Sequence, residues 1–195
     1  MSFFLTPPKN TKLVSQLTGV LSNADINQVL SYVSTQSVSN GLVGGGAGGR
    51  ENLEIRRSKT FFFPTNDDTK WLYNKIAQII NDTNHRIFNF TLTALQNIQY
   101  TEYHSIDNGV YHDHLDWMCN VIYPRKLSMS IQLTDGTEYQ GGDLEIKLSS
   151  QNPIKASRVK GDALVFPSFL LHGVTPITYG IRKSLVVWVE GPEWK

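Results

Sequence analysis

The sequence predicts a mainly β fold with flanking helices, a double-stranded β-helix (jelly roll) whose helices pack on the outside of the major sheet. Three observations support this fold class. Short runs of β-branched and aromatic residues recur along the chain from residue 61 onward. Two earlier segments have the apolar spacing of amphipathic helices. A His-Leu-Asp motif at residues 114–116 and a distant His172 can meet only if separated strands lie side by side, as in a jelly roll.

Residues 23–33 and residues 69–81 are the two predicted helices. Ser22 or Asn23 is a suitable N-cap for the first of them. Each helix has one apolar stripe, so we expect both to pack against the outside of the sheet and to serve as structural support. The stripes consist of Ile26, Val29, Leu30 and Val33 in the first helix, and of Leu72, Ile76, Ile79 and Ile80 in the second.

A glycine-rich segment, residues 41–49, lies between the two predicted helices. Glycine imposes little conformational preference, so this segment does not fix its own structure. A phosphate-binding loop is one interpretation, but the Lys-Ser/Thr pair that a P-loop requires does not follow it. A mobile lid beside an active site suits the segment better, and a plain surface loop suits it equally well.

Seven short strands are predicted from β-branched and aromatic content. Gly141 and Gly142 mark a turn or bulge at which the chain re-enters the sheet. Residues 173–180 are interpreted as a turn-rich connection before the last strand. The predicted strands are residues 61–63, 88–92, 97–103, 127–133, 144–148, 163–166 and 183–189.

His114, Asp116 and His172 are the candidate metal ligands. Residues two apart in an extended chain point to the same side, so His114 and Asp116 share one face and Leu115 points away, toward the core. Two imidazoles and one carboxylate on one face of a metal are typical of non-heme Fe(II) oxygenases, because they leave positions open for a cosubstrate and O2. His112 competes with His114, but no carboxylate stands two residues after it.

Arg182 stands at the start of the last predicted strand. Its planar guanidinium can pair bidentately with the far carboxylate of 2-oxoglutarate while the near end of that molecule chelates the metal. Alternate residues of the strand share its face, and they form a plausible wall for a bound dicarboxylate: Arg182, Ser184, Val186 and Trp188.

The second half of the chain, residues 103–194, resembles the catalytic domain of 2-oxoglutarate/Fe(II)-dependent prolyl 4-hydroxylases and their bacterial and phage PKHD-type relatives. The first half matches more loosely, through residues 55–59 and the helical stretch around Trp71. The resemblance rests on motifs in the family's order and spacing: Tyr-His-Asp-His-Leu-Asp at 111–116, Gly-Gly-Asp-Leu at 141–144, Lys-Gly-Asp-Ala-Leu-Val-Phe-Pro-Ser at 160–168, His-Gly-Val-Thr-Pro at 172–176 and Gly-Ile-Arg-Lys-Ser-Leu at 180–185.

The resemblance implies a role for each candidate residue. The catalytic iron ligands are His114, Asp116 and His172. The residues that bind the cosubstrate are Arg182, Tyr103 and Ser184. Gln132 aligns with a tyrosine that some relatives use as a second contact to the far carboxylate, and Ser184 is the expected substitute. The candidates for substrate binding are Tyr111, Trp188 and Arg57.

The reaction implied by the resemblance is an oxidative hydroxylation. Fe(II) is the cofactor, 2-oxoglutarate and O2 are cosubstrates, and ascorbate is the reductant; 2-oxoglutarate leaves as succinate and CO2. Asp116 favours hydroxylation, because relatives that halogenate lack this carboxylate. The expected substrate is a proline of a peptide or protein, converted to 4-hydroxyproline. Arg56, Arg57 and the glycine-rich segment are candidates for gripping a peptide.

Two alternatives to a prolyl hydroxylase stay open. One is the same chemistry on a free amino acid, a lipid, a nucleobase or another side chain. The other is a non-enzymatic, cupin-like module that binds a metal or a sugar. Arg182 and Ser184 on one strand face disfavour the second, because a metal module has no need of a dicarboxylate clamp.

The composition fits one domain over residues 1–195, with supporting helices and strands in residues 1–100 and the catalytic jelly roll in residues 101–195. The 18 basic and 17 acidic side chains give a net charge of +1, so neither a nucleic-acid nor an anionic-membrane partner is expected. The single cysteine, Cys119, excludes an intrachain disulfide and favours a reducing, cytoplasmic location. No signal peptide or membrane-spanning stretch is predicted, and the oligomeric state is left open.

Overall fold

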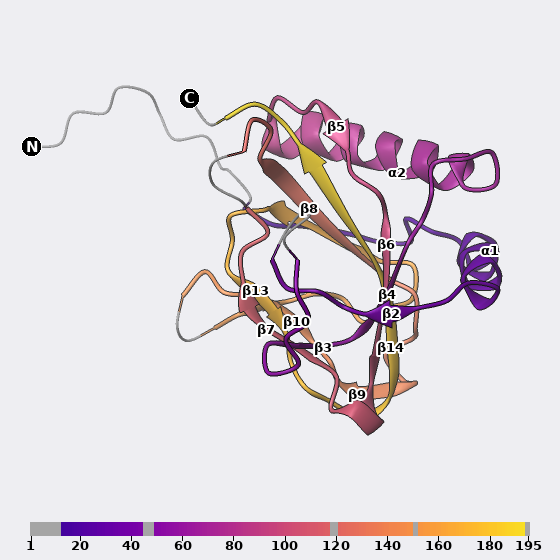
Figure 1. Cartoon of the computed structure of the whole chain (residues 1–195). Coiled ribbons are helices and arrows are strands. Elements are labelled where there is room, and N and C mark those ends of the chain that lie inside the picture. The colour runs from indigo at the N-terminus through magenta and orange to yellow at the C-terminus, as the bar shows by residue number, and fades with distance from the viewer. Residues whose placement is uncertain (1–12, 45–48, 118–120, 150–151, 194–195) are drawn as a thin grey trace, which may run out of the picture.

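Two antiparallel sheets face each other in the computed structural model, which describes residues 13–44, 49–117, 121–149 and 152–193 (Figure 1). In the described residues the larger sheet has the order β1 (Ser15–Leu17), β12 (Ala163–Pro167), β8 (Arg125–Gln132), β14 (Ile177–Glu190), β6 (Gln99–His104), β4 (Lys59–Phe62) and β2 (Ser39–Asn40), with β5 (Ala94–Leu95) and β9 (Tyr139–Gly141) also paired to β14. The smaller sheet has the order β11 (Ile154–Lys155), β10 (Leu144–Ile146), β13 (His172–Val174), β7 (Val110–His114) and β3 (Arg56–Arg57).

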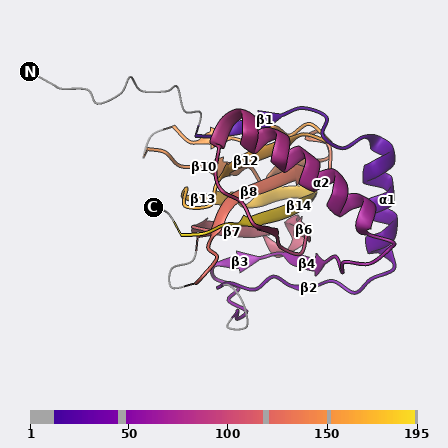
Figure 2. The same cartoon turned by 90° about the horizontal axis from the view of Figure 1, so that it is seen from above.

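Two helices, α1 (Asn23–Ser34) and α2 (Lys70–Thr83), cover the outside of the larger sheet, as the view from above shows (Figure 2). Ser22 is the N-cap of α1 and forms a capping box with Asp25, as its sequence position predicts. The buried stripes of both helices join one apolar cluster with residues of β8 and β14. This arrangement confirms the predicted jelly roll with external helices.

β8 and β14 each separate two environments, because successive side chains of a strand point to opposite faces. The odd-numbered residues of β8, such as Met129 and Ile131, are fully buried under the helices. The even-numbered Ser128 and Ser130 face the space between the sheets and line a cavity there. β14 shows the same alternation. Its residues under the helices are Leu185, Val187 and Val189, and its residues that line the cavity are Arg182, Ser184, Val186 and Trp188.

The strand predicted at residues 88–92 is wrong. A π-helical turn, Asn84–Phe88, follows α2, and Asn89 then takes a left-handed conformation with φ of 54°. The side chain of Asn84 donates to the carbonyl of Phe90 and accepts from its N–H at 2.9 Å, so this backbone is bonded locally instead of to a strand. The aromatic residues that suggested a strand pack against the helix core.

The other predicted strands are confirmed with shifted ends. The main difference is in the segment interpreted as a turn-rich connection, residues 173–180. It contains the end of β13 and the start of β14, and β14 runs through Gly180 at a φ of 73°. A side chain at Gly180 would meet the carbonyl oxygen of Glu138 at 2.3 Å, so only glycine lets β14 continue past β9 here.

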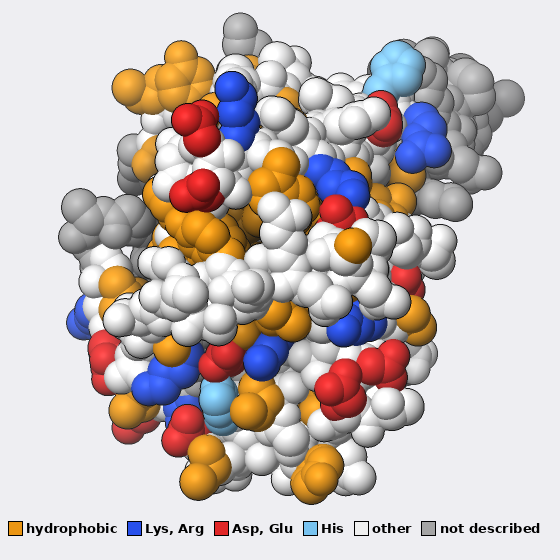
Figure 3. Space-filling view, turned by 90° about the vertical axis from the view of Figure 1, so that its right-hand side faces the viewer, with side chains coloured by type: hydrophobic (Ala, Val, Ile, Leu, Met, Phe, Trp, Pro, Cys, Tyr) orange, Lys and Arg blue, Asp and Glu red, His pale blue; other side chains and the backbone are white. Residues whose placement is uncertain are grey.

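Charged residues of both signs are interspersed over the face that carries α1 (Figure 3). Among the described residues, no helix combines the length and the apolar character that crossing a membrane requires.

Candidate metal centre and cosubstrate cavity

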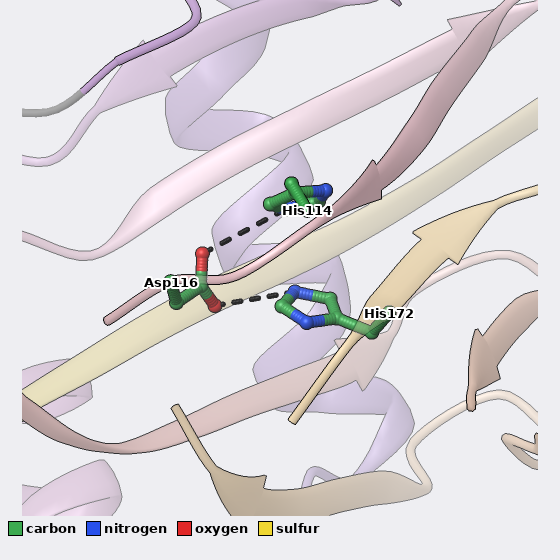
Figure 4. A group of neighbouring side chains, drawn as sticks. All are labelled: His114, Asp116 and His172. Carbon is green, nitrogen blue, oxygen red and sulfur yellow. Dashed lines mark ion pairs between the residues drawn. The ribbon is translucent and has the colours of Figure 1, made fainter. Parts of the chain in front are cut away.

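His114, Asp116 and His172 meet at one end of the smaller sheet (Figure 4). His114 ends β7 and His172 begins β13, and the two residues are paired in register across these strands. Asp116 follows two residues after His114, where its N–H donates to the carbonyl of Ser168 at 3.0 Å. One ligand atom from each of the three side chains lies within 4.8 Å of the others. The three predicted ligands therefore form one cluster.

Each member of the cluster is oriented by a second contact. His114 Nδ1 lies 2.8 Å from the carbonyl oxygen of His112, and His172 Nδ1 lies 2.8 Å from that of Leu170. Both contacts place a proton on Nδ1 and turn Nε2 toward Asp116. Ser128 donates to Asp116 Oδ2 at 2.7 Å. Such contacts fix the ligands before a metal binds.

The charges of the cluster are set by burial and by mutual contact. Burial, together with the charge of His172, lowers the pKa of His114 to about 4, so this imidazole is neutral. Burial raises the pKa of Asp116, but the hydrogen bond and charge of His172 outweigh it and hold that pKa well below its usual range. The pKa of His172 is raised, because Asp116 outweighs the effect of burial.

In the metal-free cluster, the raised pKa of His172 and the lowered pKa of Asp116 favour an ion pair between these two side chains, whereas the imidazole of His114 is neutral. His172 Nε2 and Asp116 Oδ2 form the pair at 3.3 Å. His114 Nε2 also lies 3.7 Å from Asp116 Oδ1, but a neutral imidazole makes this a polar contact only. Two imidazole nitrogens and a carboxylate on the wall of an open cavity fit the ligand set of non-heme Fe(II), which leaves the opposite side free.

A cavity of about 660 Å³ lies between the two sheets beside this cluster. The volume falls in the usual range for a ligand site and exceeds what 2-oxoglutarate alone would fill. All the site residues predicted from the sequence except Arg57 line it: His114, Asp116, His172, Arg182, Tyr103, Ser184, Tyr111 and Trp188.

Arg182 is a buried cation in the wall of this cavity, 3% exposed. Its Nε donates to Gln132 Oε1 at 3.2 Å, and its guanidinium lies 5.8 Å from the ring centre of Tyr103. No carboxylate of the described residues forms an ion pair with it. The buried hydroxyl of Ser184 also has no hydrogen-bond partner there. Because buried charges and hydroxyls are normally paired, both groups fit an anionic ligand such as the far carboxylate of 2-oxoglutarate.

Gln132 orients Arg182. Its amide nitrogen donates to the carbonyl of Thr134 at 2.8 Å and to the hydroxyl of Tyr139 at 2.9 Å. These two bonds leave the amide oxygen of Gln132 as the acceptor for the arginine. The sequence analysis noted Gln132 only because some relatives have a tyrosine at this position, and it did not predict the contact with Arg182.

Tyr111 stacks on the first histidine ligand. The ring centres of Tyr111 and His114 are 3.6 Å apart with an angle of 17° between the planes. Arg56 covers the other face of Tyr111, 4.6 Å from its ring centre, and its guanidinium donates to Ser58 and to the carbonyl of Leu42. Arg56 therefore belongs to the cavity wall.

The structure places Arg57 and Leu115 differently from the sequence prediction. Arg57 lies outside the cavity lining and donates to the backbone carbonyls of Asn108 and Leu53 at 3.0 Å each. Leu115 is 46% exposed at the cavity mouth and is not a core residue, because β7 ends at His114 and the alternation stops there.

Two features singled out in the sequence lie partly or wholly outside the described residues. One is Cys119, which the structure does not describe. Of the glycine-rich segment, residues 45–48 lie outside, whereas Gly44 and Gly49 on either side of them line the cavity. Its role as a lid stays a prediction.

Sequence analysis missed two residues of the site, Ser128 and Arg125. Ser128 supports Asp116, and Arg125 lines the cavity with its guanidinium over the ring of Trp188. The alternation of β8 contained a signal for Ser128, because polar residues at 128, 130 and 132 lie opposite the apolar 127, 129 and 131. No such signal pointed to Arg125, which is the first residue of the strand.

Comparison with known proteins gives one family. Residues 98–190 match the 2OG-Fe(II) oxygenase superfamily. A PKHD-type hydroxylase from Synechococcus sp. (strain CC9311) is 42% identical over 83 residues, which cover 42% of this chain and 37% of the relative. A PKHD-type hydroxylase from Prochlorococcus marinus (strain MIT 9515) is 30% identical over 143 residues, 72% of this chain and 59% of the relative. The chain thus spans less than two thirds of either protein.

Solved structures with a similar fold include two prolyl hydroxylases. The prolyl hydroxylase from Trichoplax adhaerens, in complex with a peptide fragment of the hypoxia inducible factor oxygen degradation domain, has a TM-score of 0.75 at 20% identity, over 92% of this chain and 84% of that chain. A prolyl-4-hydroxylase from Pseudomonas putida has a TM-score of 0.71 at 19% identity, over 93% of this chain and 94% of that chain.

Proposed function

Since this chain contains a domain of the 2OG-Fe(II) oxygenase superfamily, we propose that it is a 2-oxoglutarate- and Fe(II)-dependent dioxygenase that hydroxylates an unactivated C–H bond. The observation that carries the proposal is Arg182, which forms no ion pair with any described residue and lies in the wall of the cavity that also contains the ligand cluster. A module that only binds a metal or a sugar would gain nothing from burying a cation there, because an unpaired buried charge is costly.

The residues of the chain have separate tasks in this reaction. His114, Asp116 and His172 would hold Fe(II), which, with 2-oxoglutarate and O2, supplies the oxidation. Arg182 and Ser184 would bind the far carboxylate and so fix the orientation of 2-oxoglutarate. The cavity walls would limit the access of water to the reacting groups once substrate fills the cavity, which would suppress side reactions.

The proposed substrate is a proline in a peptide or protein, hydroxylated at C4. The names of the PKHD-type relatives and the peptide-bound prolyl hydroxylase among the fold neighbours support this choice. The cavity has room for a side chain beyond 2-oxoglutarate. Tyr111 and Trp188 line it and are the proposed contacts of the substrate ring. Ascorbate as reductant and a cytoplasmic location remain predictions from the sequence.

The test is release of succinate by the purified protein with Fe(II), ascorbate, O2 and 2-oxoglutarate, with and without a panel of proline-containing peptides. We expect peptide-stimulated turnover and a peptide that gains the mass of one oxygen atom. Asp116→Ala is the matched control, because it removes a ligand and should show neither. Absence of turnover together with absence of metal-dependent binding of 2-oxoglutarate would refute the dioxygenase assignment. Turnover stimulated only by free amino acids would refute the peptide substrate alone.

A further inference from the structure

Arg182 is connected to the surface of the molecule by a chain of contacts that lies behind the cavity wall. Its Nε donates to Gln132, and the amide of Gln132 donates to the hydroxyl of Tyr139. The partly exposed Arg158 covers the ring of Tyr139. None of Gln132, Tyr139 and Arg158 lines the cavity, so none of them would touch the cosubstrate. Any effect of these three residues on the cosubstrate must therefore pass through Arg182.

The amide of Gln132 has only one favourable orientation. Its nitrogen faces the carbonyl oxygen of Thr134 at 2.8 Å, and a carbonyl oxygen accepts but never donates. Its oxygen faces Arg182 Nε at 3.2 Å, and a guanidinium donates but never accepts. Exchange of the two amide atoms would place oxygen against oxygen and N–H against N–H. Gln132 is buried, so water would not relieve that mismatch, and the acceptor for Arg182 is therefore fixed.

Tyr139 holds the second donor of this amide and is itself held in place. Its hydroxyl accepts from Gln132 Nε2 at 2.9 Å, and the residue is buried. The guanidinium of Arg158 lies 4.2 Å from the ring centre of Tyr139 and donates to the backbone carbonyl of the same residue at 2.6 Å. Arg158 also forms an ion pair with Asp143 at 2.8 Å. These contacts fix β9, and with it the position of the hydroxyl that Gln132 needs.

The stem of Arg182 runs beside the same segment of backbone. Gly142, which follows β9, has a φ of 64°, and a Cβ at this position would lie 3.4 Å from Arg182 Cδ and 3.6 Å from Cδ2 of Tyr139. The segment that positions Tyr139 therefore also bounds the stem of the arginine, while Gln132 holds its guanidinium. A shift of the guanidinium along the cavity would break the bond to Gln132, so its depth in the cavity is set from outside the lining.

We propose that Gln132 and Tyr139 are positioning residues that fix the depth of the Arg182 guanidinium and thereby restrict the cosubstrate to 2-oxo dicarboxylic acids of the length of 2-oxoglutarate. The inference rests on the proposed dioxygenase function and deepens it. The metal ligands would hold the near end of the acid and Arg182 the far end. Two fixed anchors accept one chain length, because a misplacement of about 1 Å can cost about 100-fold. An arginine with a free guanidinium would instead follow a longer acid, since its stem is flexible.

The test compares 2-oxoglutarate with 2-oxoadipate, which is one methylene longer. Binding is measured by calorimetry under argon with the protein saturated with Mn(II), so no turnover is needed. In the wild type we expect 2-oxoglutarate to bind about 10- to 100-fold more tightly than 2-oxoadipate. A third acid, 2-oxopentanoate, has the length of 2-oxoglutarate but lacks the far carboxylate, so its affinity measures the contact with the metal alone.

Gln132→Met keeps a long side chain but removes the acceptor for Arg182. It should weaken the binding of 2-oxoglutarate about 10-fold and leave that of 2-oxoadipate and 2-oxopentanoate unchanged, so the preference for the shorter dicarboxylate falls about 10-fold. Tyr139→Phe should lower the preference by less, and it should add nothing in the Gln132→Met background, because Tyr139 acts through Gln132. Tyr73→Phe is the matched control, since it removes a hydroxyl that bonds the carbonyl of Phe63 outside the cavity.

A melting shift caused by Mn(II) alone verifies that each variant is folded. Equal weakening of both dicarboxylates in Gln132→Met, which a merely structural role would give, overturns the inference, and so does a wild type that binds both equally. If Gln132→Met does not fold, the same comparison in Tyr139→Phe decides, and an unchanged preference there overturns the inference. Failure of the wild type to bind 2-oxoglutarate with Mn(II) would instead overturn the proposed function.

Discussion

Replacing Arg182 with glutamine should remove most of the affinity for 2-oxoglutarate while metal binding persists. Arg182 is buried, is held by a single bond to Gln132, and has no carboxylate partner in the described residues, so its remaining donors are available to the cosubstrate. Two charge-assisted hydrogen bonds contribute about 1.5–3 kcal/mol each. Losing both costs at least about 3 kcal/mol, which raises Kd about 150-fold. Ser184 remains and retains a weak contact.

Thermal unfolding in Mn(II) measures this loss. At a concentration of about 1,000 times the wild-type Kd, 2-oxoglutarate should stabilise the wild type by about 4 kcal/mol and Arg182→Gln by about 1 kcal/mol. In a domain of this size the corresponding rises in Tm are about 8–16 °C and about 2–4 °C. Mn(II) alone should stabilise both proteins equally, which verifies that the variant is folded. A full shift with 2-oxoglutarate in Arg182→Gln would refute the cosubstrate assignment.

Four further predictions concern the metal ligands. His172→Ala should abolish the melting shift caused by Mn(II) as well as turnover, because only two ligands remain; a retained shift would place the metal elsewhere. Metal affinity, measured by calorimetry between pH 6 and 9, should fall about ten-fold per unit as the pH drops below the raised pKa of His172, because the metal must displace that proton. It should level off above that pKa, and a flat profile would contradict the ion pair. In the metal-free protein the same pair adds stability below the unfolded pKa of about 6.5 and loses it as the pH rises through the folded pKa. Ser128→Ala should weaken metal binding about 10-fold or more, because the carboxylate of Asp116 loses the donor that orients it, whereas Ser130→Ala, on the same strand face, is the control that should leave the affinity unchanged.

Residues of the candidate site differ in how far the sequence reveals them. His114 and Asp116 stand two apart in an extended motif, so their shared direction follows from local geometry. The direction of the Arg182 side chain follows from the alternation of side chains along its own strand, which places it on the same face as Ser184. The support of Asp116 by Ser128 depends on how two strands and a turn pack, and that contact joins residues twelve apart in the chain. Local patterns do not determine such contacts.

The wrong strand at residues 88–92 has a similar origin. Its aromatic residues pack against the helix core. Aromatic residues are also enriched in strands, so their presence alone does not distinguish a strand from another conformation that packs them there. The side chain of Asn84, four residues before Phe88, bonds the backbone locally and terminates the helix in a π-helical turn. The residue types predicted a strand here, whereas the backbone conformation depends on the amide of Asn84.

β14 presents its chemistry and its packing at alternate positions, and this makes the strand intolerant of changes in length. Inserting or deleting one residue before Ser184 would exchange the two faces over the affected part of the strand. Leu185 and Val187 would then enter the cavity, and polar side chains would enter the core beneath the helices. Substitutions at cavity positions alone keep the core intact. Variants of this chain can therefore change the bound ligand through substitutions on the cavity face of β14. An insertion or deletion of one residue in the strand would instead disrupt the core and the site together.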